Sequence, residues 1–297
     1  MLPSPGLPAF DYVRPTSVEH VTKLLHKRDG QARLFMGGTD VFVRMRDGLI
    51  APEMLIDLKH LPGMTEIKFT KRTGLRIGAA ASMNALARHP AVVEHYPLLV
   101  EAITSVASYQ LRTRATMGGN LCNASPAADT APAALVLDAK MVLRGRRGER
   151  CVPIGEFFLG PGKTAMKPGE FLLRIEIPPM PKGALGRYLK LGRNARGDLA
   201  IVGVAVLGYS DRKAKSGCAF RIALASVAPT PIRAPKAEAL LAASPLAPDV
   251  IESAASAAME TAQPIDDVRS SAAYRKAMVK VFTRRAIAAV ANSLGGR

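Results

Sequence analysis

The sequence predicts an α+β fold with two small N-terminal modules and a C-terminal module in which strands precede helices. Residues 1–62 and 63–180 each mix short apolar strands with helical stripes, whereas residues 183–297 begin with long strand patterns and end with Ala-rich helical ones. A chain of 297 residues with 48% hydrophobic content is long enough to bury more than one core. We therefore expect three domains, at 1–62, 63–180 and 183–297.

The first module is predicted to begin with a helix. Thr16 and Glu19 have the spacing of a capping box. The helix that they introduce carries an apolar stripe formed by Val18, Val21, Leu24 and Leu25. A short strand is expected at 33–36, because Gly37-Gly38 stops this apolar run, and a helix is expected over 40–45. The glycine pair thus lies at a strand-to-helix corner, where backbone amides can capture phosphate.

The remaining elements are predicted from alternation and from proline and glycine breaks. Strands are expected at 55–58, 65–69, 75–79, 140–144, 150–154, 171–177, 186–192, 199–209 and 218–227. Helices are expected over 83–88, 98–107, 128–137, 234–243, 248–262 and 271–294. Pro178-Pro179 closes the strand at 171–177, and Gly145 to Gly148 form the turn between two of the strands.

The most informative stretch runs from Leu111 to Thr130 and contains Gly118-Gly119-Asn120. Glycine permits positive φ and close approach to a ligand, so a turn at this pair can point successive amides at a pyrophosphate. Each glycine pair alone is typical of an ordinary tight turn. Together, the two turns can hold one phosphorylated cofactor from both sides. Side-chain donors are available at Thr39, Thr116, Asn120 and Ser125.

In their context, these motifs resemble those of the FAD-binding medium subunit of molybdenum hydroxylases, the family of xanthine dehydrogenase and aerobic carbon monoxide dehydrogenase. The resemblance is carried by Met36 to Asp40, Arg112 to Asn120 and Ala124 to Asp129. It continues in the family's order through 157–164, 171–178, 190–193 and 198–200, and so spans nearly the whole chain. It implies a two-lobed FAD-binding domain of the PCMH or VAO type, followed by a C-terminal α+β domain with an antiparallel sheet and helices.

The resemblance also implies which residues bind FAD. The first pyrophosphate loop corresponds to Leu34, Phe35, Met36, Gly37, Gly38, Thr39, Asp40 and Val41, and the second to Thr116, Met117, Gly118, Gly119 and Asn120. Further candidates are Val106, Ser125, Asp129, Leu172 and Lys190. Asp129 matches an acid that contacts the cofactor, while Leu172 and Lys190 match residues near the adenine and the flavin ring. Val106 stands where some relatives have an aromatic, and Gly38 where xanthine dehydrogenases have Asn, which favours the bacterial branch with separate subunits.

The function implied by the resemblance is electron transfer within a complex. A large partner subunit would carry the molybdenum cofactor and a small one two [2Fe-2S] clusters, and FAD on this chain would exchange electrons with NAD, a quinone or another carrier. A dimer of heterotrimers, a heterohexamer, is expected. Lys190 and Arg193 are candidates for stabilising the anionic reduced flavin, and Asp198 for lining the acceptor's entrance; ordinary salt bridges at a strand end are the alternative. No catalytic or metal-ligating residue is assigned to this chain.

Composition bears on the remaining classes of protein. The formal net charge of +17 raises the question of nucleic acid, but the basic residues are scattered and Trp is absent, so solvated faces and an acidic protein partner explain the charge better. Membrane insertion and export are not expected, because no run of about twenty apolar residues occurs and Met1 to Pro5 lack a basic n-region. Cys122, Cys151 and Cys218 lack metal-ligand spacing and are predicted to be reduced thiols of a cytoplasmic protein.

Two other functions stay open on the residues alone. A self-contained flavin oxidase or dehydrogenase of the same fold would need a large substrate domain, for which the C-terminal module is small. A scaffold without cofactor is disfavoured by the intact glycine pairs and Asp129. The run from Gly160 to Thr164 resembles the end of a phosphate-binding P-loop, but the required upstream glycine is missing, and Pro168-Gly169 interrupts any following helix.

Overall fold

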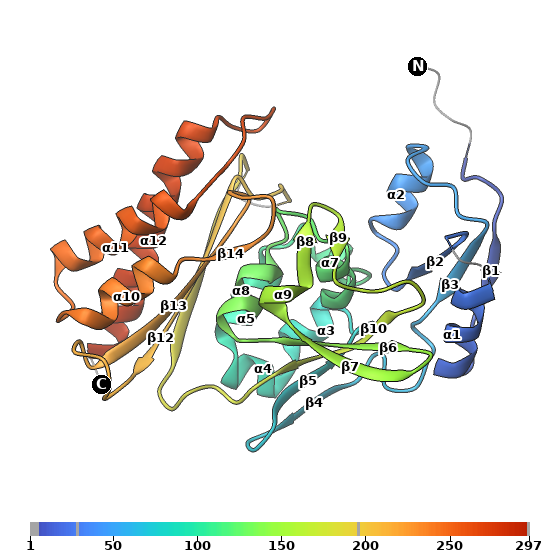
Figure 1. Cartoon of the computed structure of the whole chain (residues 1–297), viewed down its shortest axis with the longest axis horizontal. Coiled ribbons are helices and arrows are strands. Elements are labelled where there is room, and N and C mark those ends of the chain that lie inside the picture. Colours follow the sequence, from blue (N-terminus) through green and yellow to red (C-terminus); the bar gives the residue numbers. More distant parts are fainter. Residues whose placement is uncertain (1–5, 28–29, 195–196, 296–297) are drawn as a thin grey trace.

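A computed structural model describes residues 6–27, 30–194 and 197–295 of the chain, so Met1 to Pro5, which were considered above for an export signal, lie outside the described residues. The described residues form three larger sheets and a two-stranded hairpin, with helices packed around them (Figure 1). The sheets follow one another along the long axis of the molecule in the order of the sequence. This arrangement confirms the predicted α+β fold.

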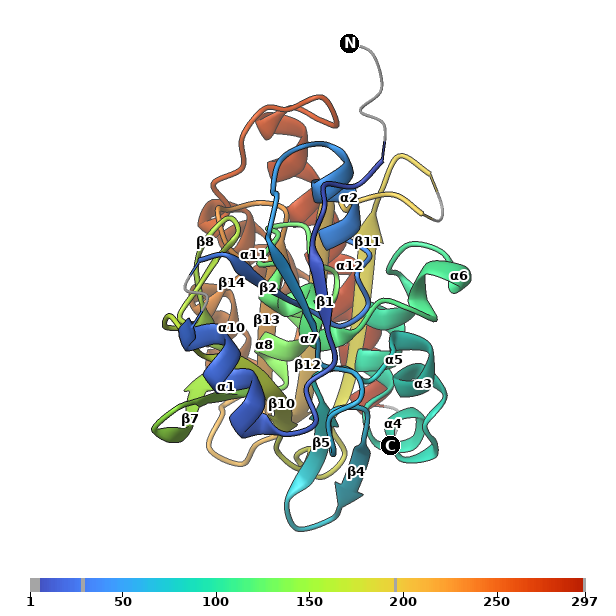
Figure 2. The ribbon, with the colours of Figure 1, turned by 90° about the vertical axis from the view of Figure 1, so that its right-hand side faces the viewer.

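The first lobe contains a parallel sheet of β1 (Asp11–Val13), β3 (Met54–Asp57) and β2 (Ala32–Phe35), in that order. Figure 2 shows this lobe in front. Two helices connect its strands, α1 (Val18–Lys27) and α2 (Val41–Arg46). The N-terminal cap of α1 is Ser17, whose Oγ accepts a hydrogen bond from the His20 amide at 3.1 Å. The predicted capping box at Thr16 and Glu19 is therefore wrong. The helix begins at Val18, so its cap is Ser17, one residue after Thr16.

The second lobe contains a five-stranded antiparallel sheet in the order β4 (Ile67–Thr70), β5 (Gly74–Gly78), β10 (Phe171–Ile177), β6 (Lys140–Gly145), β7 (Gly148–Pro153). Between β5 and β6 the chain forms α3 (Met83–Arg88), α4 (Pro90–His95), α5 (Pro97–Thr104), α6 (Tyr109–Arg112), α7 (Met117–Cys122) and α8 (Thr130–Val136). After β7 come α9 (Ile154–Phe157) and a small hairpin of β8 (Phe158–Gly160) and β9 (Lys163–Thr164).

The second glycine pair does not form the predicted turn. Gly118 and Gly119 lie in the first turn of α7, and neither has a positive φ. The helix is started by Thr116, whose side-chain oxygen accepts a hydrogen bond from the Gly119 amide at 2.9 Å. Gly118 is needed for a close approach rather than for a turn, since a Cβ there would lie 2.4 Å from the carbonyl oxygen of Ala79.

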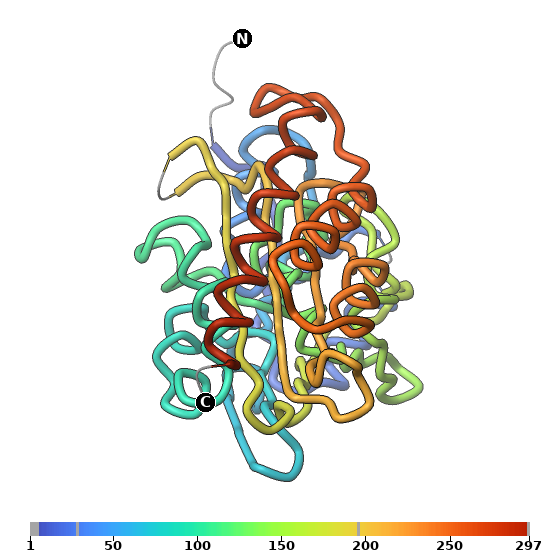
Figure 3. Tube along the Cα trace, turned by 90° about the vertical axis from the view of Figure 1, so that its left-hand side faces the viewer, coloured from blue at the N-terminus to red at the C-terminus, as the bar shows by residue number. Residues whose placement is uncertain are grey.

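The C-terminal part is an antiparallel sheet of β11 (Leu185–Leu191), β12 (Val202–Ser210), β13 (Cys218–Ala225) and β14 (Ile232–Arg233), followed by α10 (Pro235–Ala243), α11 (Pro248–Thr261) and α12 (Ala272–Gly295). Figure 3 shows the three helices in front of the sheet. Its other face packs on α5 and α8 of the second lobe. The central strand β12 is consequently buried on both faces, over seven consecutive residues, whereas the edge strand β11 is mostly half-buried.

Two main hydrophobic cores follow from this layering. One joins the lobes to the near face of the C-terminal sheet through Tyr188, Ala205, Leu207 and Ala223. The other lies between the far face of that sheet and α10 to α12. Within the described residues, no helix combines the length and the apolar character needed to cross a bilayer.

Candidate functional site

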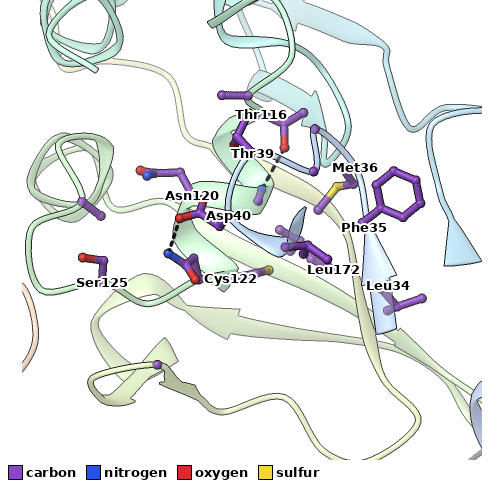
Figure 4. A pocket seen from close by; sticks show the side chains of 18 of the residues that line it. Leu34, Phe35, Met36, Thr39, Asp40, Thr116, Asn120, Cys122, Ser125 and Leu172 are labelled. Atoms are coloured by element: carbon purple, nitrogen blue, oxygen red, sulfur yellow. Dashed lines mark hydrogen bonds between the residues drawn. The ribbon is translucent and has the colours of Figure 1, made fainter. Parts of the chain in front are cut away.

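A cleft of about 710 Å³ lies between the two lobes and reaches the C-terminal part at Gly197 to Leu199. Its volume falls within the range of small-molecule sites, about 300–1,000 Å³. Its walls include most of the residues predicted to bind a cofactor: Leu34, Phe35, Met36, Gly37, Gly38, Thr39, Asp40, Val41, Val106, Thr116, Gly119, Asn120, Ser125, Asp129 and Leu172. Figure 4 shows the segment 34–40 facing Thr116, Asn120 and Ser125 across this cleft.

The first wall is the loop between β2 and α2. Gly38 has a φ of +77°, which non-glycine residues rarely adopt. Gly37 packs tightly on the second lobe, because a Cβ there would lie 2.2 Å from the carbonyl oxygen of Arg114. Within the part of the chain that the structure describes, the amides of Gly37, Gly38, Thr39 and Asp40 have no hydrogen-bond acceptor. Four consecutive unpaired amides beside a cleft supply hydrogen-bond donors of the kind that an anion site requires.

The opposite wall is the start of α7. Gly119 and Asn120 line the cleft, whereas Met117 and Gly118 are buried and do not line it. A helix turns about 100° per residue, so neighbouring residues cannot all face one side. Asn120 is oriented by Thr130, whose hydroxyl donates to the Asn120 side-chain oxygen at 2.6 Å. The structure thus separates the residues of this motif into one group that faces the cleft and another that supports it.

A hydrogen bond joins the two walls. The side-chain amide of Asn123 donates to the Asp40 carboxylate at 3.0 Å, a bond that Figure 4 draws as the dashed line ending at Asp40. Burial raises the pKa of Asp40 above its ordinary value, against the opposing effect of Arg44. Asp40 therefore connects the lobes from within the cleft wall.

Asp129 occupies the part of the cleft wall next to the C-terminal sheet. One of its oxygens accepts from the Tyr188 hydroxyl at 2.7 Å, and the other accepts from the Lys190 ammonium at 2.7 Å. Lys190 also donates to the Ser105 carbonyl at 2.9 Å. Burial raises the pKa of Asp129, although Lys190 and Tyr188 act in the opposite direction. Lys190 does not line the cleft, so it acts on the site through Asp129 and Ser105.

The sequence motifs missed several residues of the cleft. Cys122 and Asn123 of the α7 region, and Leu159, Lys163 and Thr164 of the β8–β9 hairpin, also line it. The hairpin belongs to the run 157–164 that carried part of the family resemblance, and that signal could have suggested a role in the site. Arg193 lies elsewhere, in the wall of a smaller neighbouring cavity of about 230 Å³ that also contains Asp198.

Comparison with known proteins agrees with this architecture. Residues 8–180 match the family model for the FAD binding domain in molybdopterin dehydrogenase, and residues 187–290 match that for the CO dehydrogenase flavoprotein C-terminal domain. The chain is 33% identical to the carbon monoxide dehydrogenase medium chain of Hydrogenophaga pseudoflava, over 94% of this chain and 96% of that one. It is 32% identical to the putative xanthine dehydrogenase FAD-binding subunit of Escherichia coli K12, over 90% of this chain and 91% of that one.

Solved structures show the same similarity. A structure of carbon monoxide dehydrogenase from Hydrogenophaga pseudoflava, which lacks the Mo-pyranopterin moiety, superposes with a TM-score of 0.92 at 34% identity, covering 97% of this chain and 99% of that one. Quinoline 2-oxidoreductase from Pseudomonas putida 86 gives a TM-score of 0.90 at 28% identity, covering 98% and 99% of the two chains.

The two-lobed fold and its cleft define a flavoprotein component of an oxidoreductase. The chain belongs to the family of FAD-binding medium subunits of molybdenum hydroxylase-type dehydrogenases, which includes the xanthine and carbon monoxide dehydrogenase subunits. The resemblance found in the glycine motifs is thereby confirmed.

Proposed function

We propose that this chain holds FAD in the cleft and exchanges electrons between the [2Fe-2S] clusters of a small partner subunit and an external carrier such as NAD or a quinone. In this proposal, a large partner subunit holds the molybdenum cofactor. The observation that carries it is that residues 37–40, whose four consecutive amides are unpaired within the described part of the chain, line a cleft of about 710 Å³. The partners are supported by relatives that are named as medium chains of dehydrogenases.

The fit of FAD to this site is supported by the chemistry of both walls. The amides of Gly37 to Asp40 supply donors for a diphosphate, and Gly119 leaves the opposite wall without a side chain. We assign diphosphate binding to Leu34 to Val41 and to Gly119 and Asn120, with Ser125 as a further donor. Met117 and Gly118 support that wall from within α7, and Thr116, which caps the helix, lines the cleft itself. The apolar side chain of Leu172 provides a surface for the adenine.

We assign the surroundings of the flavin ring to Val106, Asp129 and Leu199, which also line the cleft. Bound FAD would supply the capacity to take up and release electrons singly or in pairs. The chain's own residues orient the ring and exclude water from it. Asp129 and Lys190 form an ion pair, so before the ring is reduced neither charge is buried without a partner. When reduction adds a negative charge to the ring, the positive charge of Lys190 would balance it.

The proposed assembly is a dimer of heterotrimers in the cytoplasm, with this chain divided into domains at 1–62, 63–180 and 183–297. The net charge of +17 favours partners with acidic surfaces. All three cysteines are unpaired, and Cys151 is exposed, which favours a reducing compartment.

The experiment is to purify the chain alone and together with its co-purifying partners. A flavin absorption spectrum with about one FAD per chain would support the cofactor assignment, and molybdenum and iron in the larger complex would support the partners. Turnover of an organic substrate by the isolated chain with FAD would instead favour a self-contained oxidase. A chain that refuses added FAD would overturn the proposal.

A further inference from the structure

We infer that Lys59, which does not line the cleft, is a positioning residue that turns the Gly37 amide toward the cofactor's diphosphate. The inference rests on the proposed binding of FAD and extends it to a residue that none of the family motifs includes. It is built from a chain of contacts that starts at Tyr12 and ends at the Met36–Gly37 peptide.

The central group in these contacts is a buried acid, Asp57, at the end of β3. Only 1% of the Asp57 side chain is exposed. One oxygen of its carboxylate accepts from the Tyr12 hydroxyl at 2.6 Å, and the other accepts from the Lys59 ammonium at 2.7 Å and from the Lys59 amide at 3.0 Å. Burial by itself would raise the pKa of Asp57, but the hydrogen bonds from Lys59 and Tyr12 outweigh it and the pKa is lowered. Asp57 is therefore a fixed negative charge.

Asp57 in turn fixes Lys59. The ammonium of Lys59 lies 4.2 Å from the centre of the Phe35 ring, and it donates a second hydrogen bond to the Met36 carbonyl at 2.9 Å. The carboxylate, the ring and the carbonyl oxygen together hold one cation in one place. Lys59 thus binds the residue that immediately precedes the glycine pair.

The consequence for Gly37 comes from the geometry of the peptide bond. In a trans peptide, the carbonyl oxygen and the amide hydrogen of the same plane point in opposite directions. Because the Met36 oxygen points at Lys59, the Gly37 N–H points away from it. That amide has no acceptor within the described part of the chain, and Gly37 itself lines the cleft. Lys59 thus presets the first donor of the anion site before any ligand arrives, which lowers the cost of ordering the loop on binding.

The test uses the full chain, stripped of flavin, titrated with FAD and separately with riboflavin, which lacks phosphate. For Lys59→Met we expect FAD to bind about tenfold more weakly, as for the loss of one oriented hydrogen bond to a charged group, while riboflavin binding stays within about twofold of wild type. Lys59→Arg, which keeps a donor, should recover part of the loss. The ³¹P resonances of bound FAD should shift in Lys59→Met. Lys68→Met is the matched control, because Lys68 lies on β4 and pairs only with surface Glu66 among the contacts that the structure gives it.

Each outcome separates this inference from the proposed function. If wild type binds no FAD, the proposed function fails. If wild type binds FAD but Lys59→Met binds it equally well with unchanged ³¹P shifts, or loses FAD and riboflavin to the same extent, Lys59 has no role specific to the diphosphate. Lys59→Met leaves Asp57 without its cation and can misfold for that reason. The double variant Asp57→Asn/Lys59→Met removes both charges and must show the same selective loss of FAD.

Discussion

The Tyr188 hydroxyl donates a 2.7 Å hydrogen bond to Asp129, and this contact joins β11 of the C-terminal sheet to an acid in the wall of the cleft. Lys190, two residues further along the same strand, donates to the other oxygen of Asp129. Glu101 of α5 reinforces the junction by accepting from the Tyr188 amide at 2.7 Å. The C-terminal sheet is thus part of the structure of the site, although nearly all of the cleft's lining belongs to the two lobes.

Replacing Tyr188 with Phe removes only the hydroxyl of this contact. We expect the free energy of unfolding of the flavin-free chain to fall by about 1.5–3 kcal/mol, because a buried hydrogen bond to a charged acceptor is lost. FAD affinity should fall as well, since Asp129 loses one of its two anchors. Urea unfolding and FAD titration measure the two effects. Tyr274→Phe on α12, where the ring is 47% exposed, should change neither. If Tyr188→Phe changed neither the free energy of unfolding nor the FAD affinity, the contact would contribute nothing to stability or binding.

Replacing Gly37 with Ala tests the close approach of the two lobes. The added Cβ would lie 2.2 Å from the Arg114 carbonyl oxygen, a contact that requires backbone to move. We expect a loss of stability of about 1–3 kcal/mol, as for overpacking, together with loss of bound FAD. Thermal unfolding and the flavin content of the purified chain are the measurements. Gly155→Ala in α9 is the control, since no atom lies within 4 Å of its added Cβ. Normal flavin content in Gly37→Ala would show that the close contact between Gly37 and Arg114 is not needed for FAD binding.

The stability of the chain should depend on pH through Asp267. Hydrogen bonds from Arg269 and Arg275 hold the pKa of Asp267 well below its ordinary value. Only 2% of the Arg275 side chain is exposed. A carboxyl with a depressed pKa in the folded state stabilises the protein above its unfolded pKa, near 3.8, and this contribution is lost as the pH falls further. Asp267→Asn should therefore be less stable than wild type at pH 7, with a difference that narrows below about pH 4. Chemical unfolding at pH 7, 5 and 3 checks this, and a difference independent of pH would contradict it.

The cysteines should differ in reactivity toward iodoacetamide. Burial raises the pKa of the Cys122 thiol to about 12, so it stays protonated at pH 8 and is a poor nucleophile. Cys151 on β7 is exposed. We expect mass spectrometry to show alkylation at Cys151 well before Cys122, in the native chain. Unfolding in urea should remove the difference. Early labelling of Cys122 in the native chain would contradict the raised pKa of its thiol.

Local signals were sufficient for many elements. The helix at 83–88 and the strand at 171–177 were predicted with the bounds that the structure has. Pro178-Pro179 ended the predicted strand, and the structure adds that Ser82 caps the helix. Local signals failed at Gly118-Gly119, where a glycine pair typical of a turn begins a helix instead. A glycine that avoids a clash with a distant backbone has the same local pattern as one that adopts positive φ, and only the position of Ala79 distinguishes them here.

By itself, the sequence determined the family, the α+β fold class and two of the segments that line the cleft, 34–41 and 116–129, because those depend on local periodicity and on short motifs. The tertiary structure alone decided which residues of those motifs face the cleft and which support it, as the contrast between Gly119 and Gly118 shows. It also revealed the contacts from Lys59 to Met36 and from Tyr188 to Asp129, which join positions 23 and 59 residues apart. Such contacts are set by the packing of the lobes and the C-terminal sheet, and residues this far apart leave no periodic pattern in a single sequence.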